Sequence, residues 1–309
     1  MGKVAFVFPG QGSQKVGMGK DAYDGDAAAR AVFDEADRAL SESLSTLCFE
    51  GPEDALQLTA NTQPAILTAS IALWRALDAK ADMTAGHSLG EYSAHVAAST
   101  LSFADAVRTV RTRGQLMQEA VPVGAGAMAA IMGGEKSAIE KACADVKSGR
   151  VSPVNYNCPG QIVIAGDAAA VADACAAIAT LGAKAIPLKV SAPFHSALML
   201  PAEERLLPKL TAIAMRDPEI PVYVNVDAAA VIKADAARDA LGRQVSRPVR
   251  WDECIQRMVQ DGATLFVEIG PGKVLTGLIG RIHKESKRIN VQTLADIAPA
   301  REAIAQARS

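Results

Sequence analysis

The chain alternates short apolar runs that end at glycine or proline turns with longer stretches in which apolar residues recur at helical spacing. The run at 3–8 precedes Pro9-Gly10, and the run at 264–269 precedes Gly270-Pro271. Both have the length and composition of buried strands, and three similar runs lie at 83–86, 221–226 and 290–294. This alternation predicts an open, mostly parallel sheet with helices on both faces, whose ligands bind beyond the carboxyl ends of the strands.

The middle of the chain follows a different order. Strand-like runs lie at 127–132, 151–156, 161–165 and 184–190. One helical segment separates the first two runs, a turn separates the middle two, and a second helical segment separates the last two. The resulting βαββαβ order predicts a ferredoxin-like subdomain. We therefore expect this subdomain at 125–191, inserted into a large α/β-hydrolase-like unit that is formed by 1–124 and 192–309.

Composition and charge exclude several classes of function. Half of the 309 residues are hydrophobic, and the formal net charge is −2, so no basic surface for nucleic acid is expected. The five cysteines form no C-x-x-C pair, and their odd number favours a reducing compartment. No apolar run approaches the roughly 18 residues of a membrane span, and the N-terminal run is too short for a signal peptide. We predict a cytoplasmic protein that binds neither nucleic acid nor membrane.

The segment Gly86-His87-Ser88-Leu89-Gly90 has the spacing of a nucleophile elbow, a sharp turn between a strand and a helix. The flanking glycines would let the backbone fold tightly and push the serine hydroxyl outward. Ser88 is the candidate nucleophile, and the Leu89 N–H at the start of the next helix could stabilise an oxyanion. Because the pattern is short, a chance match in a chain rich in alanine and glycine is the alternative interpretation.

A serine nucleophile needs a base, and the chain has four histidines. His87 adjoins Ser88, where neighbouring side chains diverge, so we expect it to shape the turn. His95 lies two helical turns away, and His283 lies among basic residues typical of a solvated surface. His195 remains, in the loop where the chain leaves the predicted subdomain and faces a cleft; a loop histidine without function is the alternative. The sequence selects no carboxylate to orient it, so a backbone carbonyl is also possible.

Two further features concern the substrate. The glycine-containing loop at 9–14 follows the first predicted strand and could supply a second oxyanion donor. On the predicted helix at 103–121, Arg113 lies about 65° from the centre of the apolar stripe, closer than Arg108 or Arg111. We expect Arg113 to be half-buried. A planar guanidinium there suits a carboxylate ligand, and an internal salt bridge is an equal alternative.

Together these segments resemble the malonyl-CoA:acyl-carrier-protein transacylase family over essentially the whole chain. Several long motifs in the order of the family are more specific than any single one. The motifs are Phe8-Pro9-Gly10-Gln11-Gly12-Ser13-Gln14, Gln63-Pro64-Ala65, Gly86-His87-Ser88-Leu89-Gly90-Glu91-Tyr92, Arg113 with Gln118, Pro159-Gly160-Gln161, Phe194-His195, and Gly270-Pro271-Gly272-Lys273-Val274-Leu275.

The resemblance implies ping-pong acyl transfer with a Ser-His dyad. Ser88 would be acylated, and His195 would be its base. The backbone N–H groups of Gln11 and Leu89 would form the oxyanion hole. A main-chain carbonyl near Arg247, before Pro248-Val249-Arg250-Trp251, would orient the imidazole.

The resemblance also implies the acyl group. Arg113 would hold the malonyl carboxylate, and Gln161 and Phe194 would contact the substrate. Leu after the serine and Phe before the histidine, here Leu89 and Phe194, match relatives that select malonyl over methylmalonyl groups.

The implied partners are malonyl-CoA and an acidic acyl carrier protein, with no bound cofactor or metal, and we expect a monomer in fatty-acid synthesis. A trans-acting acyltransferase of polyketide synthesis and a serine thioesterase are the alternatives. Two basic clusters are candidates for carrier docking or simple solvated faces: Arg281, Lys284, Lys287 and Arg288, and Arg243, Arg247 and Arg250.

Overall fold

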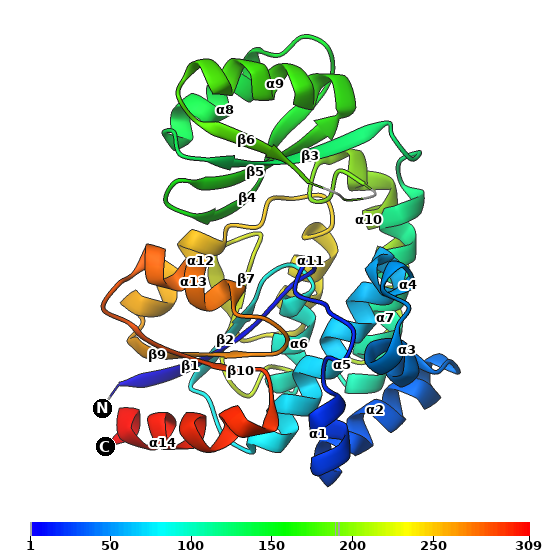
Figure 1. The fold of residues 1–309 in the computed structure, drawn as a ribbon, viewed down its shortest axis with the longest axis vertical. Helices are drawn as coiled ribbons and strands as arrows, with labels where there is room; N and C mark the ends of the chain where they lie inside the picture. Colours follow the sequence, from blue (N-terminus) through cyan, green and yellow to red (C-terminus); the bar gives the residue numbers. More distant parts are fainter. Residues whose placement is uncertain (1, 189, 191) are drawn as a thin grey trace.

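The computed structural model describes residues 2–188, 190 and 192–309 (Figure 1). Its larger sheet has the strand order β10-β9-β1-β2-β7-β8. Within the described residues, β8 is the one strand of this sheet that runs antiparallel to its neighbour. The predicted open, mostly parallel sheet is confirmed. Its strands are β1 (Lys3–Phe8), β2 (Met83–Gly86), β7 (Val222–Val224), β8 (Ala229–Val231), β9 (Ala263–Ile269) and β10 (Lys287–Val291).

Side chains that alternate along β1 explain why helices cover both faces of this sheet. Val4, Phe6 and Phe8 enter one core with α2, α5 and α14, whereas Ala5 and Val7 enter a second core with α12 and α13. The helices of this unit are α1 (Lys20–Gly25), α2 (Ala27–Leu40), α3 (Leu44–Glu50), α4 (Glu53–Gln57), α5 (Thr59–Leu77), α6 (Gly90–Ala97), α7 (Phe103–Glu119), α10 (Leu200–Ala212), α11 (Ala234–Arg243), α12 (Trp251–Gln260), α13 (Val274–Ile282) and α14 (Ile297–Arg308), with short 3-10 turns η1 (Ala197–Met199) and η2 (Leu294–Asp296).

The middle of the chain forms a second, antiparallel sheet in the order β4-β5-β3-β6 (green in Figure 1). Ala129 and Ile131 on β3 pack under α8 and α9, whereas Met128 and Ala130 face the larger unit. The predicted ferredoxin-like order is confirmed. Its elements are β3 (Gly126–Met132), α8 (Lys136–Asp145), β4 (Val151–Cys158), β5 (Gln161–Asp167), α9 (Ala168–Thr180) and β6 (Lys184–Pro187).

Backbone hydrogen bonds attach β4 to the larger unit. The Tyr156 N–H donates to the Val249 carbonyl at 2.9 Å, and the Val249 N–H donates to the Val154 carbonyl at 2.8 Å. The side of β4 that carries Asn155 and Asn157 therefore faces the loops that follow β1 and β2. Domain boundaries at 124/125 and 191/192 stay a prediction, and Ser191 lies outside the described residues.

Several strands differ from the sequence prediction. β10 ends at Val291, because the Gln292 and Thr293 N–H groups donate to Asp296 instead of continuing the sheet. β7 ends at Val224, because Asn225 turns toward the elbow described below. The short β8 was not predicted, since its two alanines and one valine show no alternation. The strand expected at 184–190 is described only to Pro187, and Lys189 lies outside the described residues. None of the described helices is long and apolar enough to cross a membrane.

Candidate active site

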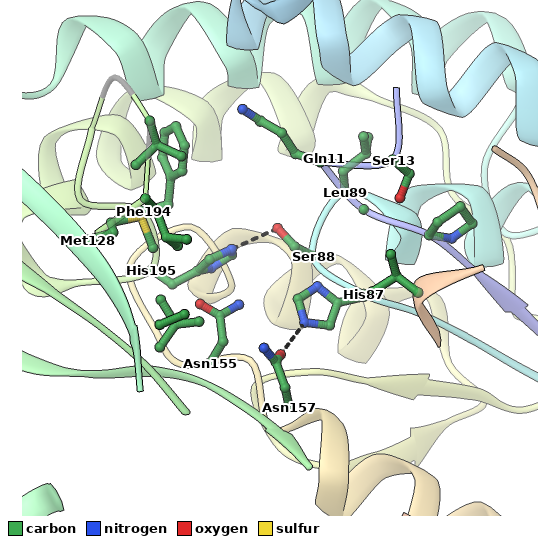
Figure 2. Close-up of a pocket in the computed structure, with 18 of the residues that line it drawn as sticks. Gln11, Ser13, His87, Ser88, Leu89, Met128, Asn155, Asn157, Phe194 and His195 are labelled. Carbon is green, nitrogen blue, oxygen red and sulfur yellow. Dashed lines mark hydrogen bonds between the residues drawn. The ribbon is translucent and has the colours of Figure 1, made fainter. Parts of the chain in front are cut away.

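The predicted nucleophile elbow joins the end of β2 to the start of α6. Ser88 has a φ of 51°, a left-handed conformation that residues other than glycine rarely adopt. Asn225 holds this turn: its Oδ1 accepts the Ser88 N–H at 2.7 Å, and its Nδ2 donates to the Gly86 carbonyl at 2.8 Å. With its N–H bound in this way, Ser88 presents its Oγ to the cavity (Figure 2).

Gly90 allows α6 to pack directly on the end of β1. A Cβ at this position would lie 2.1 Å from the Phe8 carbonyl oxygen and 2.8 Å from that of Pro9. We expect Gly90→Ala to lower the free energy of unfolding by about 2–3 kcal/mol, because backbone must move to admit the methyl group. Gly277→Ala is the control, since a Cβ there meets nothing within 4 Å, and it should preserve or slightly raise stability. Urea denaturation measures both, and equal stabilities would contradict this prediction.

His195 is brought to Ser88, with its Nε2 2.7 Å from the serine Oγ (Figure 2). Its Nδ1 lies 2.8 Å from the Gln244 carbonyl oxygen, which can only accept a hydrogen bond. The proton therefore resides on Nδ1, and Nε2 is left to accept the serine proton. A backbone carbonyl from the loop before Pro248 lies against the imidazole, and it belongs to Gln244, three residues before Arg247. A backbone hydrogen bond at Arg247 also raises the pKa of this histidine. Gln244 follows the last residue of α11, where carbonyl groups lack partners within the helix.

Burial controls the charge of the His195 imidazole. His195 is only 4% exposed. Desolvation by burial, followed by the positive charge of Arg113, lowers its pKa to about 3. The imidazole is therefore neutral and able to accept a proton throughout the neutral pH range.

Arg113, on α7, is 1% exposed, so the prediction that it is half-buried is wrong. Its Nη1 donates to Gln63 Oε1 at 2.8 Å, and its Nη2 donates to Gln244 Oε1 at 2.9 Å and lies 3.3 Å from Ser88 Oγ. Among the described residues no carboxylate lies within ion-pair distance of it, which argues against the internal salt bridge. A buried cation with neutral partners beside the nucleophile can bind an anionic group of a substrate.

A cavity of about 380 Å³ lies between the two units and brings the predicted site residues together. Its walls come from the loop after β1, the elbow, α7, α13 and the face of the smaller sheet that is turned toward the larger unit. The lining includes Gln11, Ser88, Leu89, Arg113, Gln161, Phe194 and His195.

Four further predicted site residues line this cavity: Gln11, Leu89, Gln161 and Phe194. The Gln11 side chain donates to Thr59 Oγ1 at 3.2 Å. In the described part of the chain the backbone N–H groups of Gln11 and Leu89 have no partner, so both remain able to bind an oxyanion. Gln161 Oε1 accepts a hydrogen bond from Arg281 at 3.3 Å, and Phe194 is buried against the cavity.

Sequence reasoning missed the amides that hold this site. Asn225 and Gln244 were given no role, and Gln63 was noted only within a motif. The one available signal for Asn225 was a polar residue directly after the apolar run Val222-Tyr223-Val224. His87 points away from Ser88, and its Nε2 lies 2.9 Å from Asn157 Oδ1 on β4, in keeping with its predicted role in shaping the turn (Figure 2).

The two predicted basic clusters differ in their partners. In one, Arg243 pairs with Asp227 and Asp239, so its charge is internally balanced. In the other, Arg281 donates to Gln161, which lines the cavity, and to the Pro159 carbonyl.

His95 lies on α6 outside the cavity lining, as its distance from Ser88 along the helix predicts. It is fully buried, and among the described residues neither ring nitrogen has a hydrogen-bond partner. Burial lowers its pKa to about 3. Below about pH 6.5 the unfolded chain binds a proton at His95, whereas the native state does not bind it until the pH is near 3. The free energy of unfolding therefore decreases as the pH falls from about 6.5 toward 3.

We therefore expect the wild type to lose about 2 kcal/mol more unfolding free energy between pH 7 and pH 5 than His95→Leu. The raised pKa of Glu91 acts in the opposite direction, but it is common to both proteins and cancels in this comparison. Urea denaturation of both proteins at the two pH values measures the difference. Equal losses would show that His95 is protonated in the native state.

Comparisons with known proteins agree on one family. Residues 5–303 match the family model described as acyl transferase domain. The chain is 50% identical over 297 residues to the malonyl CoA-acyl carrier protein transacylase of Bacillus subtilis, covering 94% of each chain. A solved acyl carrier protein S-malonyltransferase from Vibrio cholerae has a TM-score of 0.94 and 47% identity, covering 96% of this chain and 99% of the other. A malonyl-transacylase solved in complex with a type II PKS acyl-carrier protein has a TM-score of 0.95 and 45% identity, covering 97% and 99%.

Proposed function

The chain belongs to the malonyl-CoA:acyl-carrier-protein transacylase family, and we infer that it transfers malonyl groups from malonyl-CoA to the phosphopantetheine thiol of an acyl carrier protein. It is thus an acyl-carrier-protein S-malonyltransferase. The observation that best supports this activity is the buried Arg113 guanidinium, 3.3 Å from the Ser88 hydroxyl. A cation at this distance from the nucleophile suits an acyl group that ends in a carboxylate.

The first half-reaction acylates the enzyme. His195 Nε2 takes the proton of Ser88 as Oγ attacks the thioester carbonyl of malonyl-CoA. The N–H groups of Gln11 and Leu89 stabilise the oxyanion of the tetrahedral intermediate. The carbon–sulfur bond then breaks, the CoA sulfur takes the proton from His195, and a malonyl-Ser88 ester remains.

The second half-reaction reverses these steps with a different thiol. The phosphopantetheine thiol of the carrier gives its proton to His195 and attacks the ester carbonyl. Collapse of the tetrahedral intermediate returns the proton to Ser88 Oγ. Arg113 would fix the malonyl group by its carboxylate through both steps, so that the reacting carbonyl stays beside the oxyanion donors.

Further parts of the proposal concern the setting of the enzyme. Gln161 and Phe194 would contact the acyl or pantetheine chain, because both line the cavity. We propose a cytoplasmic monomer that serves fatty-acid synthesis, and the scheme requires no bound cofactor or metal. The structural likeness to a transacylase that binds a type II PKS carrier favours a polyketide carrier as the second candidate acceptor. Comparing kcat/KM for a fatty-acid carrier and a polyketide carrier separates the two.

The test uses purified protein, malonyl-CoA and peptide mass spectrometry. A malonyl adduct on Ser88 that disappears in Ser88→Ala and moves to added carrier protein would support the proposal. Ser13→Ala is the control, because it removes another serine of the same cavity and should retain the adduct. An adduct released only to water would favour the thioesterase, and no adduct would contradict acyl transfer through serine.

A further inference from the structure

Glu91 is a buried acid that the proposed mechanism does not use. It lies on α6, three residues after the nucleophile, and is fully buried. One carboxylate oxygen accepts the Asn225 N–H at 2.7 Å, and within the described residues no cation forms an ion pair with it. A buried carboxylate with so little compensation is costly, so a nearby positive charge is needed to stabilise it.

Arg113 presents the opposite problem, a buried cation without a carboxylate at ion-pair distance. Gln244 lies between the two charges. Its Oε1 accepts from Arg113 at 2.9 Å, and its Nε2 donates to the Ser88 carbonyl at 3.1 Å. The Glu91 backbone N–H donates to the same Ser88 carbonyl at 3.0 Å, so this amide lies beside Glu91, whose Oε1 has no hydrogen-bond partner among the described residues. The Gln244 amide therefore connects the Arg113 guanidinium to the turn that carries Glu91.

We propose that Glu91 is the resident counter-charge of Arg113, coupled to it through Gln244, and that it weakens binding of carboxylated acyl groups whenever it is ionised. The inference rests on the proposed malonyl transfer. A malonyl carboxylate at Arg113 would place a second anion near Glu91, and two anions near one cation repel each other. Binding of malonyl-CoA is then accompanied by proton uptake from solvent at Glu91, which an acetyl group would not cause.

The surroundings of Glu91 support this coupling near neutral pH. Arg113 faces it from α7, Asp227 from the turn after β7, Cys254 from α12 and Tyr92 from its own helix. Burial raises the pKa of Glu91 to about 7, with Arg113 lowering it and Asp227 raising it. An added substrate anion acts in the same direction as Asp227.

The test measures binding in a Ser88→Ala background, where no acyl transfer occurs. Glu91→Gln keeps an oxygen for the Asn225 N–H and removes the charge. At pH 8 we expect it to lower the Kd for malonyl-CoA roughly fivefold and to leave that for acetyl-CoA unchanged. At pH 6, where Glu91 is mostly protonated, the difference should nearly vanish. Glu253→Gln, which removes one charge from the surface of α12, is the control and should change neither affinity.

Equal or weaker malonyl-CoA binding by Glu91→Gln at pH 8, or equal tightening for both thioesters, would overturn the inference. A calorimetric measurement tests the inference without a substitution at Glu91. At pH 7, in buffers of different ionisation enthalpy, binding of malonyl-CoA should be accompanied by more proton uptake than binding of acetyl-CoA. Equal proton uptake for the two thioesters would also overturn the inference. If Ser88→Ala binds both thioesters alike at pH 6 and pH 8, the carboxylate role of Arg113 fails with it. If wild-type protein transfers malonyl groups but these affinities do not respond to Glu91, the inference alone fails.

Discussion

Replacing His195 with alanine should lower kcat for malonyl transfer by about 10³- to 10⁴-fold. The proton of Ser88 would lose its acceptor, because the Arg113 guanidinium that also contacts Ser88 Oγ can only donate, and within the described residues His195 Nε2 is the one contacting group able to accept. The KM for malonyl-CoA should change little, since the oxyanion donors and Arg113 stay in place. Single-turnover formation of the malonyl-enzyme measures the loss directly. His283→Ala, which removes a surface histidine at the end of α13, should keep full activity.

The same prediction extends to pH in the wild type. Because the pKa of His195 is about 3 in the free enzyme, kcat/KM should show no loss centred near pH 6.5. A profile that falls about tenfold between pH 7.5 and pH 5.5 would show that the imidazole titrates normally, and would contradict the lowering of its pKa by burial and by Arg113.

The sequence predicted the parts of the site whose structure depends on neighbouring residues in the chain. Gly86 and Gly90 mark the elbow because backbone atoms pack against both, and this local requirement is visible in the spacing. Gln244 and Asn225 could not be predicted in the same way. Each reaches Ser88 from a distant segment, and an amide in a loop has no periodic pattern that would indicate its partner.

Arg113 shows where a helical pattern stops being informative. The angle from the apolar stripe ranked Arg113 as more buried than Arg108, and that ranking is confirmed, since the Arg108 side chain is 51% exposed. The apolar pattern of α7, however, does not show which other segments pack beside the apolar stripe of that helix. Gln63 on α5 and Gln244 after α11 cover that flank, so a position predicted to be half-buried is fully enclosed.

The fold could be predicted more completely than the site for a related reason. Short apolar runs that end in glycine or proline define β1 and β9 locally, and the βαββαβ order leaves few ways to arrange the smaller sheet. Boundaries failed where tertiary contacts decide them, as at β7, where Asn225 leaves the sheet to bond the elbow.

Arg113→Ala should affect two acyl donors in opposite directions. We expect kcat/KM for malonyl-CoA to fall by about 10²- to 10³-fold, because the proposed charge-assisted contact of Arg113 with the malonyl carboxylate would be lost. Transfer of acetyl groups should instead rise a few-fold, because the Arg113 charge that lowers the pKa of His195 is removed and the base becomes stronger. Steady-state assays with both thioesters measure the ratio. Arg108→Ala, which removes an exposed arginine from the same helix, should leave both rates unchanged.

The signs of the two effects are what identify the role of Arg113. If its guanidinium only supported the fold through Gln63 and Gln244, its removal would lower both rates together. If it only bound the carboxylate, acetyl transfer would not change. A fall in malonyl transfer together with a rise in acetyl transfer would indicate that the same charge binds the carboxylate and weakens the base. Under that arrangement, a bound malonyl carboxylate neutralises Arg113 and thereby restores the basicity of His195 when the correct substrate is in place. Part of the selectivity for malonyl groups is then expressed in kcat rather than in KM.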